Sequence, residues 1–293
     1  MQKYGGSSVA DAASVKRVAQ RIVDTKKQGH EVVVVVSAMG DTTDELIELA
    51  EQVSPKPAAR ELDMLLTAGE RISMAVLAMA IHDLGMEARS YTGSQAGLIT
   101  DATHGKARII DVAPERIRQA LDEGAIPIVA GFQGVSKSTK DITTLGRGGS
   151  DYTASVIGAA LGVKEIEIWT DVDGMMTADP RKVKSAFTIP SISYAEAMEL
   201  THFGAKVIYP PSLQPAFAKN IPIRVLNTFN PSFEGTVVSK EPTGSPYIIT
   251  GISSIDQLAL VNLQGSGMIG VAGVSAKLFT VLAREKISVV LIS

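Results

Sequence analysis

The chain has 293 residues, with 28 basic residues against 31 acidic ones and a formal net charge of −3. This balance argues against a nucleic-acid or membrane-surface protein, which would carry a basic excess or a basic stripe. The absence of cysteine excludes a disulfide framework, thiolate catalysis and cysteine-ligated metal sites. No uninterrupted apolar run reaches 18 residues and no apolar signal stretch opens the chain. We therefore expect a cytoplasmic enzyme without a membrane span.

Segments typical of strands and helices alternate along the first 229 residues. Five consecutive valines within 31–37 predict a strand buried on both faces, and apolar residues spaced three and four apart over 15–23 predict a helix before it. Beyond the valines we expect helices starting near 41 and at 58–84, 114–124, 151–161, 194–203 and 211–219, and strands at 88–91, 126–132, 165–170 and 223–227. Strands separated by helices predict a mostly parallel sheet in a three-layer α/β/α sandwich. Ligands of such sheets bind beyond the carboxyl ends of the strands.

The composition changes at residues 230–247, where Asn-Pro, Glu-Gly and Pro-Thr-Gly-Ser-Pro predict a linker. Beyond it, the pattern predicts a strand at 248–263, a helix at 270–285 and a strand at 287–292. This single βαβ unit of about 45 residues is small for an independent domain. We expect further chain, or a partner chain, to complete its fold.

Two polar clusters fall where such a fold binds ligands. The first, Lys-Tyr-Gly-Gly-Ser-Ser at 3–8, combines an ammonium group with glycines that let backbone amides approach an anion. It lacks the Walker A spacing, and a plain strand–turn–helix connection explains it equally well. The second, at 37–44, places small and hydroxylated residues after the valine strand. These could bind a small polar ligand and also cap the next helix.

Two further clusters carry more charge. The third, at 145–151, places glycines around Arg147 at the start of a helix, where the guanidinium can bind a carboxylate through two hydrogen bonds. A flexible hinge is the alternative interpretation, and Asp151 could accept from an α-ammonium group or orient Lys3. The fourth, at 170–181, mixes carboxylates with an arginine, which suits a nucleotide with Mg²⁺ as well as an ordinary loop.

Two single ionisable residues are also candidates. Glu70 interrupts an otherwise apolar helix, and either pairs with Arg71 at the surface or contacts a substrate. Lys206 lies among apolar residues, where a lysine is seldom found without an anionic partner.

Taken in order, these motifs resemble those of aspartate kinases. The motif at 3–8 resembles the opening lysine–glycine motif of the family, and 144–151 resembles its most distinctive signature. The segments 170–174, 177–181 and 203–207 match its nucleotide-side motifs, so the resemblance covers essentially the whole chain. It implies an amino-acid-kinase fold, with an eight-stranded, mostly parallel sheet between helices, followed by a regulatory ACT domain.

The resemblance implies a domain organisation and a reaction. The kinase domain would be 1–229, with an aspartate-binding part up to about 151 and an ATP-binding part over 152–229, and 248–293 would be a partial ACT-like domain. The reaction would convert ATP and L-aspartate to ADP and 4-phospho-L-aspartate, on the route to lysine, threonine and methionine.

The resemblance also assigns roles to single residues. The catalytic residues would be Lys3 and Asp151. The residues around aspartate would be Ser37, Thr43, Glu70, Arg147 and Ser150. The residues around ATP would be Lys3, Tyr4, Gly5, Gly6, Thr170, Asp171, Met176, Asp179, Arg181 and Lys206, although the family usually has an aromatic residue at the position of Met176.

The chemistry of the implied reaction agrees with the candidate residues that the chain offers. The acceptor carboxylate is ionised at neutral pH, so no general base is needed, and positioning with cationic stabilisation should supply most of the catalysis. Mg²⁺ would be held mainly through the nucleotide phosphates, without metal ligands from the protein. We also expect a homo-oligomer and a lysine or threonine effector site that this chain leaves incomplete.

The sequence also allows other interpretations. The part up to about Asp151 resembles monofunctional aspartate kinases, whereas the later part resembles the kinase half of bifunctional aspartate kinase–homoserine dehydrogenases, as a trimmed or chimeric chain would. Another amino-acid kinase, acting on glutamate or acetylglutamate, is one alternative. A catalytically silent amino-acid sensor is the other.

Overall fold

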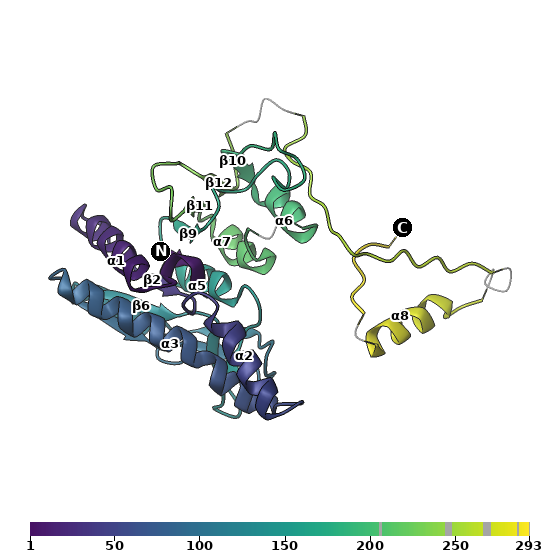
Figure 1. Ribbon diagram of the computed structural model, residues 1–293, viewed down its shortest axis with the longest axis horizontal. Coiled ribbons are helices and arrows are strands. Elements are labelled where there is room, and N and C mark those ends of the chain that lie inside the picture. Colours follow the sequence, from purple (N-terminus) through teal and green to yellow (C-terminus); the bar gives the residue numbers. More distant parts are fainter. Residues whose placement is uncertain (205–206, 244–247, 266–270, 286, 293) are drawn as a thin grey trace. The chain divides into compact units, whose positions relative to one another are not determined.

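The chain divides into two units, residues 1–254 and residues 255–293, which are described separately. The computed structural model (Figure 1) describes residues 1–204, 207–243, 248–265, 271–285 and 287–292.

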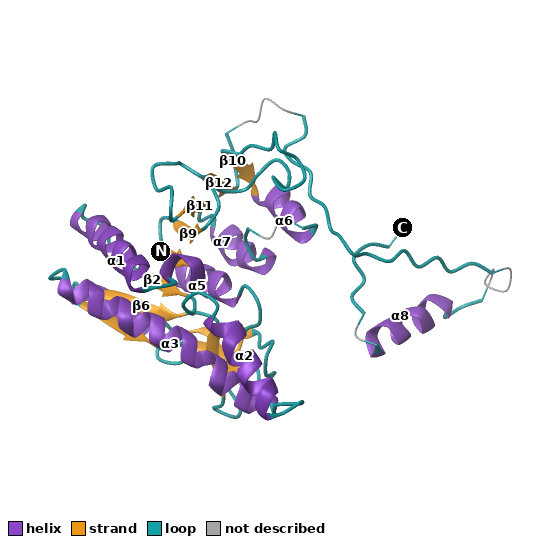
Figure 2. Ribbon diagram, viewed as in Figure 1, coloured by secondary structure: helices purple, strands orange, loops and turns teal. Residues whose placement is uncertain are grey.

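An eight-stranded sheet forms the centre of the first unit (Figure 2), in the order β10-β12-β11-β9-β1-β2-β6-β3. In that order the strands are Ser191–Ser193, Thr236–Ser239, Ile223–Asn227, Ile166–Thr170, Gln2–Tyr4, Val34–Val36, Ile126–Ala130 and Ala88–Tyr91. Neighbouring strands pair in parallel except β11 and β12, which pair antiparallel. The prediction of a mostly parallel sheet is confirmed.

The valine run shows how the sequence builds three layers. Successive side chains of a strand point to opposite faces of the sheet. Val33 and Val35 accordingly belong to one hydrophobic core, while Val32, Val34 and Val36 belong to the other, and all five are buried. The predicted burial of this strand on both faces is confirmed.

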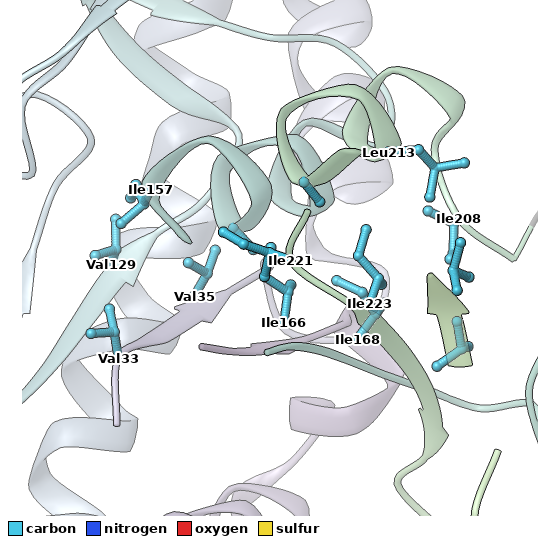
Figure 3. Close-up of a cluster of buried hydrophobic side chains, with 14 of the residues drawn as sticks. Val33, Val35, Val129, Ile157, Ile166, Ile168, Ile208, Leu213, Ile221 and Ile223 are labelled. Atoms are coloured by element: carbon cyan, nitrogen blue, oxygen red, sulfur yellow. The ribbon is translucent and has the colours of Figure 1, made fainter. Parts of the chain in front are cut away.

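Helices cover both faces of the sheet. One core packs against α1 (Ala12–Lys27) and α3 (Ala59–Asp83). The other, shown in Figure 3, packs against four helices on the opposite face. These are α4 (Glu115–Asp122), α5 (Gly149–Leu161), α6 (Tyr194–His202) and α7 (Leu213–Lys219). Outside these layers, α2 (Thr42–Val53) packs on α3, and two short 3-10 turns cover Gly6–Val9 and Pro210–Ser212.

A second, four-stranded sheet was not predicted. Its order is β5-β4-β7-β8, and its strands are Ile109–Val112, Leu98–Thr100, Gln133–Ser136 and Ile142–Thr144. Each strand has only three or four residues, which is too short for a clear alternation in the sequence. Because β8 packs against α3, the second sheet fixes the loops on either side of β8.

Helix α3 is long and apolar enough to span a bilayer, with a hydropathy of 1.5 in its most apolar stretch, and it is the one such helix in the described part of the chain. Half of that stretch is buried inside the protein, as expected for a core helix.

Two expectations about the carboxyl-terminal part differ from the structure. The predicted linker at 230–247 contributes β12 to the main sheet, because Thr236 and Val238 are fully buried there. Beyond residue 247, α8 (Val274–Arg284) lies within the predicted helix, but the described residues of 248–263 and 287–292 form no strand. A strand requires a partner, and most of the large apolar residues of these segments are exposed instead of paired.

Candidate active site

A cleft of about 1410 Å³ opens at the carboxyl ends of β1, β2 and β6. Residues that follow these strands line it, as the parallel sheet predicts, together with the start of α5 and one face of α3. The predicted site residues that line it are Lys3, Gly5, Gly6, Ser37, Thr43, Glu70, Arg147, Ser150 and Asp151. The cleft thus brings together three motifs that lie far apart in the sequence.

Lys3 and Asp151 form an ion pair in the cleft. Lys3 lies on the central strand β1, and its Nζ is 2.6 Å from Oδ1 of Asp151, with about a tenth of each side chain exposed. Asp151 lies in the first turn of α5, where the helix dipole favours a negative charge, and its Oδ2 accepts from the backbone N–H of Tyr209 at 3.4 Å. Because nearly buried charges need a partner, Asp151 holds the ammonium of Lys3 in a fixed place.

The glycines of the first motif serve close packing between two loops. A Cβ on Gly6 would lie 2.9 Å from the carbonyl oxygens of Ala38 and Gly40, and Gly40 N–H donates to the Gly6 carbonyl at 3.1 Å. The N–H of Gly5 donates to the carbonyl of Trp169 at 3.1 Å. The expectation that paired glycine amides face an anion is therefore wrong for Gly5, whose amide is already bonded within the protein.

Arg147 lies on an exposed loop whose glycines permit tight packing. Gly148 has φ of 73°, and a Cβ there would lie 2.3 Å from Cβ of Tyr209. Gly148 takes the cap position of α5, so Ser150 and Asp151 lie in the first turn of the helix. Arg147 forms no ion pair with any residue that the structure describes, so its guanidinium is available to a ligand.

Glu70 is buried within α3, with 3% of its surface exposed, so the interpretation as a surface pair with Arg71 is wrong. Its Oε1 accepts from the N–H of Ala38 at 3.1 Å, and Oε2 has no hydrogen-bond partner among the described residues. Burial raises the pKa of Glu70 to about 7. A buried carboxylate with a free oxygen, lining a cleft, is suited to a cationic ligand.

The hydroxylated residues complete the wall next to Glu70. Ser37 follows β2, and its N–H donates to the Tyr4 carbonyl at 3.1 Å. Thr43 lies in the first turn of α2, where Asp41 takes the cap position without a side-chain hydrogen bond, so capping by Asp41 is not observed. Ser150 is buried in the first turn of α5.

Tyr4, predicted at the nucleotide, is fully buried in the core instead. It follows Lys3 on β1 and therefore points to the opposite face, where its ring stacks on Trp169 with centroids 6.1 Å apart. Its hydroxyl donates to Oε1 of Gln2 at 3.3 Å. The side chain of Tyr4 is thus not among the residues that line the cleft.

The other nucleotide-side candidates lie outside the cleft lining, at the end of β9 and in the loop after it. The Thr170 hydroxyl donates to Asp171 at 3.2 Å. Arg181 pairs with Asp179, Nη2 to Oδ2 at 2.8 Å, and this hydrogen bonding lowers the pKa of Asp179 to about 2. Met176 forms an isolated bridge with Thr188. Lys206 lies outside the described residues.

Several residues that line the cleft were not predicted from the sequence, and three of them bear on the geometry of the site. Phe132 lines the cleft after β6 with φ of 67°, and Tyr209 lines it next to Gly148. Asp63 lines it from α3. The only signal for Asp63 was a second acidic residue seven positions before Glu70 in an apolar helix. The described residues contain no group of three histidine, aspartate or glutamate side chains that could hold a metal ion.

Known proteins similar to this chain agree on one family. The amino acid kinase family matches residues 2–227, and an ACT domain matches residues 261–293. The aspartokinase of Mycolicibacterium smegmatis is 53% identical over 292 residues, which cover 99% of this chain and 69% of that protein.

Two solved structures of E. coli aspartokinase III match the whole chain at 27% identity. The complex with aspartate and ADP (R-state) has a TM-score of 0.81, and this chain covers 75% of it. The complex with lysine and aspartate (T-state) has a TM-score of 0.77, and this chain covers 76% of it.

These matches also bear on the expectation that the two halves of the chain resemble different kinds of aspartate kinase. The M. smegmatis protein, named aspartokinase alone, matches both halves of the chain. The expected resemblance of the second half to bifunctional kinase–homoserine dehydrogenases has no support in these matches. The chain is an enzyme and belongs to the aspartokinases of the amino acid kinase family.

Proposed function

We propose that the cleft binds L-aspartate between Glu70 and Arg147 and presents its side-chain carboxylate to the terminal phosphate of ATP beside Lys3. One observation carries this proposal: the carboxylate of Glu70, the guanidinium of Arg147 and the ammonium of Lys3 line the same cleft. Among the described residues, one oxygen of the buried Glu70 has no hydrogen-bond partner and Arg147 has no ion-pair partner, whereas Lys3 is held in an ion pair. The solved complex of E. coli aspartokinase III with aspartate and ADP supports this choice of ligands.

The aspartate end follows from the charges of the substrate. Aspartate carries one ammonium and two carboxylates at neutral pH. Glu70 is placed to accept from the ammonium, and Arg147 can donate two hydrogen bonds to a carboxylate. Hydroxyls of Ser37, Thr43 and Ser150 supply further polar contacts along the same wall.

The reacting centre is assigned to Lys3 and Asp151. The aspartate carboxylate is already ionised, so the enzyme's task is to bring two anions together and stabilise the transferring phosphoryl group. Lys3 supplies the positive charge at that point. Asp151 holds Lys3 through the 2.6 Å ion pair and needs no proton transfer of its own.

The nucleotide is assigned to the end of β9 and the loop after it. Strand β9 pairs with β1 in parallel, with Trp169 opposite Tyr4. Thr170, which ends β9, and Asp171, which follows it, therefore come next to the Lys3 motif. The proposed ATP-binding set is completed by Gly5, Gly6, Met176, Asp179, Arg181 and Lys206. Mg²⁺ would be held through the ATP phosphates, because the described residues offer no cluster of metal ligands.

We place the reaction in the biosynthesis of lysine, threonine and methionine, in the cytoplasm, with the enzyme as a homo-oligomer. Lysine or threonine would act at the ACT region. The T-state complex of E. coli aspartokinase III with lysine supports an effector of this class. No role in binding nucleic acid or membrane is proposed.

The test is ADP release from ATP with aspartate, glutamate or acetylglutamate as acceptor. We expect turnover with aspartate alone, and an Arg147→Ala variant should raise KM for aspartate more than KM for ATP. Equal turnover with glutamate would overturn the assignment of the acceptor. A variant effect confined to KM for ATP would overturn the role of Arg147.

A further inference from the structure

Two buried acidic residues lie on one face of α3. Asp63 and Glu70 are seven positions apart, close to two helical turns, so they project in a similar direction about 10 Å apart along the axis. Both line the cleft, and 1% and 3% of their surfaces are exposed. Their hydrogen bonding differs, because one oxygen of Glu70 has no partner within the described part of the chain, while both oxygens of Asp63 are bonded.

Asp63 accepts hydrogen bonds from three residues. The Thr144 hydroxyl donates to Oδ1 at 2.6 Å, and the Gly105 N–H lies 3.1 and 3.2 Å from the two oxygens. Nδ1 of His104 is 2.7 Å from Oδ2. Since an ionised carboxylate only accepts, Nδ1 of His104 carries the hydrogen in this contact. One carboxylate therefore joins α3 to the loop after β4 and to the end of β8.

Both joined segments shape the cleft. Gly105 begins a run of five residues, 105–109, that lines it, and Thr144 precedes the loop that carries Arg147. The two segments also contact each other directly. Ala107 N–H donates to the Thr144 carbonyl at 2.9 Å, and a Cβ on Gly146 would lie 3.2 Å from the Gly105 carbonyl.

We propose that Asp63 is a positioning residue for aspartate binding. It fixes the loop of Arg147 relative to α3, the helix that carries Glu70. The distance between the group that meets a substrate carboxylate and the group that meets the ammonium is thereby held constant. This inference rests on the proposed roles of Arg147 and Glu70.

The nature of the contact explains why a carboxylate is used here. Three donors from two segments converge on one side chain, and a neutral amide offers a single acceptor oxygen and adds donors of its own. The Asp63→Asn variant therefore leaves buried donors without acceptors, which releases the two segments from α3. The hydrophobic cores on the sheet do not include Asp63, so the sheet and its helices should persist in the variant.

The test compares steady-state kinetics of Asp63→Asn, Thr144→Val and Thr144→Ser. We expect Asp63→Asn to raise KM for aspartate about tenfold or more, because small misplacements of binding groups are costly, with KM for ATP changed far less. Thr144→Val should raise KM for aspartate by a smaller factor. Thr144→Ser keeps the hydroxyl and should restore near-normal values.

Thr143→Val is the matched control. Thr143 is the neighbour of Thr144 on β8, is fully buried, and its hydroxyl lies 2.6 Å from that of Thr100 and away from Asp63. The Thr143→Val substitution removes a comparable buried hydroxyl and leaves the hydrogen bonds of Asp63 in place. If Thr143→Val and Thr144→Val change KM for aspartate alike, or if Asp63→Asn lowers only Tm, the inference fails. Should Asp63→Asn not fold, the two Thr144 variants decide.

A double variant separates this inference from the proposed function. If Asp63 acts through Arg147, then Asp63→Asn should add little to KM for aspartate in an Arg147→Ala background. If the effects of the two substitutions on KM for aspartate are fully additive, Asp63 does not act through Arg147. If Arg147→Ala alone leaves KM for aspartate unchanged, the proposed function fails. If it raises KM while Asp63→Asn does not, only the positioning role is lost.

Discussion

Lys3 combines a central strand position with an ion pair, and both features bear on catalysis. The strand fixes its backbone between β2 and β9, while Asp151 fixes its ammonium at 2.6 Å. A charge held in this way needs no reorganisation when the phosphoryl group moves, which is the condition for strong electrostatic stabilisation.

We therefore expect Lys3→Ala to lower kcat by about 100-fold or more, with a modest change in KM for ATP. Steady-state kinetics at saturating ATP and aspartate measure this. Lys16→Ala is the matched control, because Lys16 is an exposed lysine on α1 and should leave kcat unchanged. A Lys3→Ala enzyme with normal kcat would remove Lys3 from the reacting centre.

The raised pKa of Glu70 predicts a pH dependence of aspartate binding. Only the ionised carboxylate can pair with the substrate ammonium, and burial holds the pKa at about 7 in the free enzyme. KM for aspartate should therefore rise as the pH falls from 8 to 6. In the Glu70→Gln variant, KM for aspartate should be high across this whole pH range and nearly independent of pH. A wild-type KM that is flat across this range would contradict the role of Glu70.

The same group should make stability depend on pH in the free enzyme. Because the folded pKa of about 7 lies above the ordinary value of 4.5, the folded state binds the proton more tightly. The stabilisation that the proton on Glu70 gives the folded state is complete below pH 4.5 and is lost as the pH rises to 7. The resulting loss of unfolding free energy is about 3 kcal/mol at most.

Glu70→Gln keeps an oxygen for the Ala38 amide and has no charge to bury. It should exceed the wild type in unfolding free energy above pH 7, as measured by urea denaturation without ligand. Equal free energies at pH 8 would mean that Glu70 carries no burial penalty.

At the scale of residues, the sequence predicted the members of the cleft better than their contacts. The motifs around Lys3, Glu70 and Arg147 were predicted from residue type and order, and these residues do line one cleft. Tyr4 was placed wrongly because motif membership does not reveal which face of a strand a side chain occupies. Asp63 was missed because its partners come from segments about 40 and 80 positions away.

At the scale of elements, helix α5 has a glycine with positive φ at each end. Gly148 precedes it with φ of 73°, and Gly162 follows it with φ of 67°. A Cβ on Gly148 would overlap Tyr209, whereas a Cβ on Gly162 would meet nothing within 4 Å. The pair therefore separates backbone strain from steric collision within one helix.

Gly162→Ala should cost about 1–2 kcal/mol from the left-handed backbone alone and should keep its KM for aspartate. Gly148→Ala should cost more, and it should raise KM for aspartate, because displacing Tyr209 disturbs the start of α5 beside Arg147 and Asp151. Thermal denaturation and kinetics on both variants check this. Equal losses of stability would show that Tyr209 yields freely.

Elements with a strong local pattern were predictable, and elements made by distant pairing were not. The valine strand and the helices were predicted, because burial on both faces or on one stripe is written in consecutive residues. The strands β4, β5, β7 and β8 have three or four residues each and exist through their pairing. β12 was expected to be linker because its flanks are rich in proline and glycine.

At the scale of the whole molecule, the first unit extends beyond the expected kinase boundary at 229. Residues 248–254 belong to it, and they form hydrogen bonds with the loop after β9 and with α6. Ile252 N–H donates to the Thr177 carbonyl at 2.8 Å, and the Thr250 hydroxyl donates to Glu196 at 2.6 Å on α6. We therefore propose 1–254 as the unit that carries the kinase activity.

Two shortened chains test this boundary. A chain of residues 1–254 should match the full chain in Tm and in KM for ATP, because it keeps the contacts of Thr250 and Ile252. A chain of residues 1–247 loses those contacts, so the Thr177 carbonyl and Glu196 lose partners that hold the loop after β9. Its Tm should fall and its KM for ATP should rise severalfold, with KM for aspartate changed less. If both shortened chains bind ATP equally well, residues 248–254 have no part in holding the nucleotide loop.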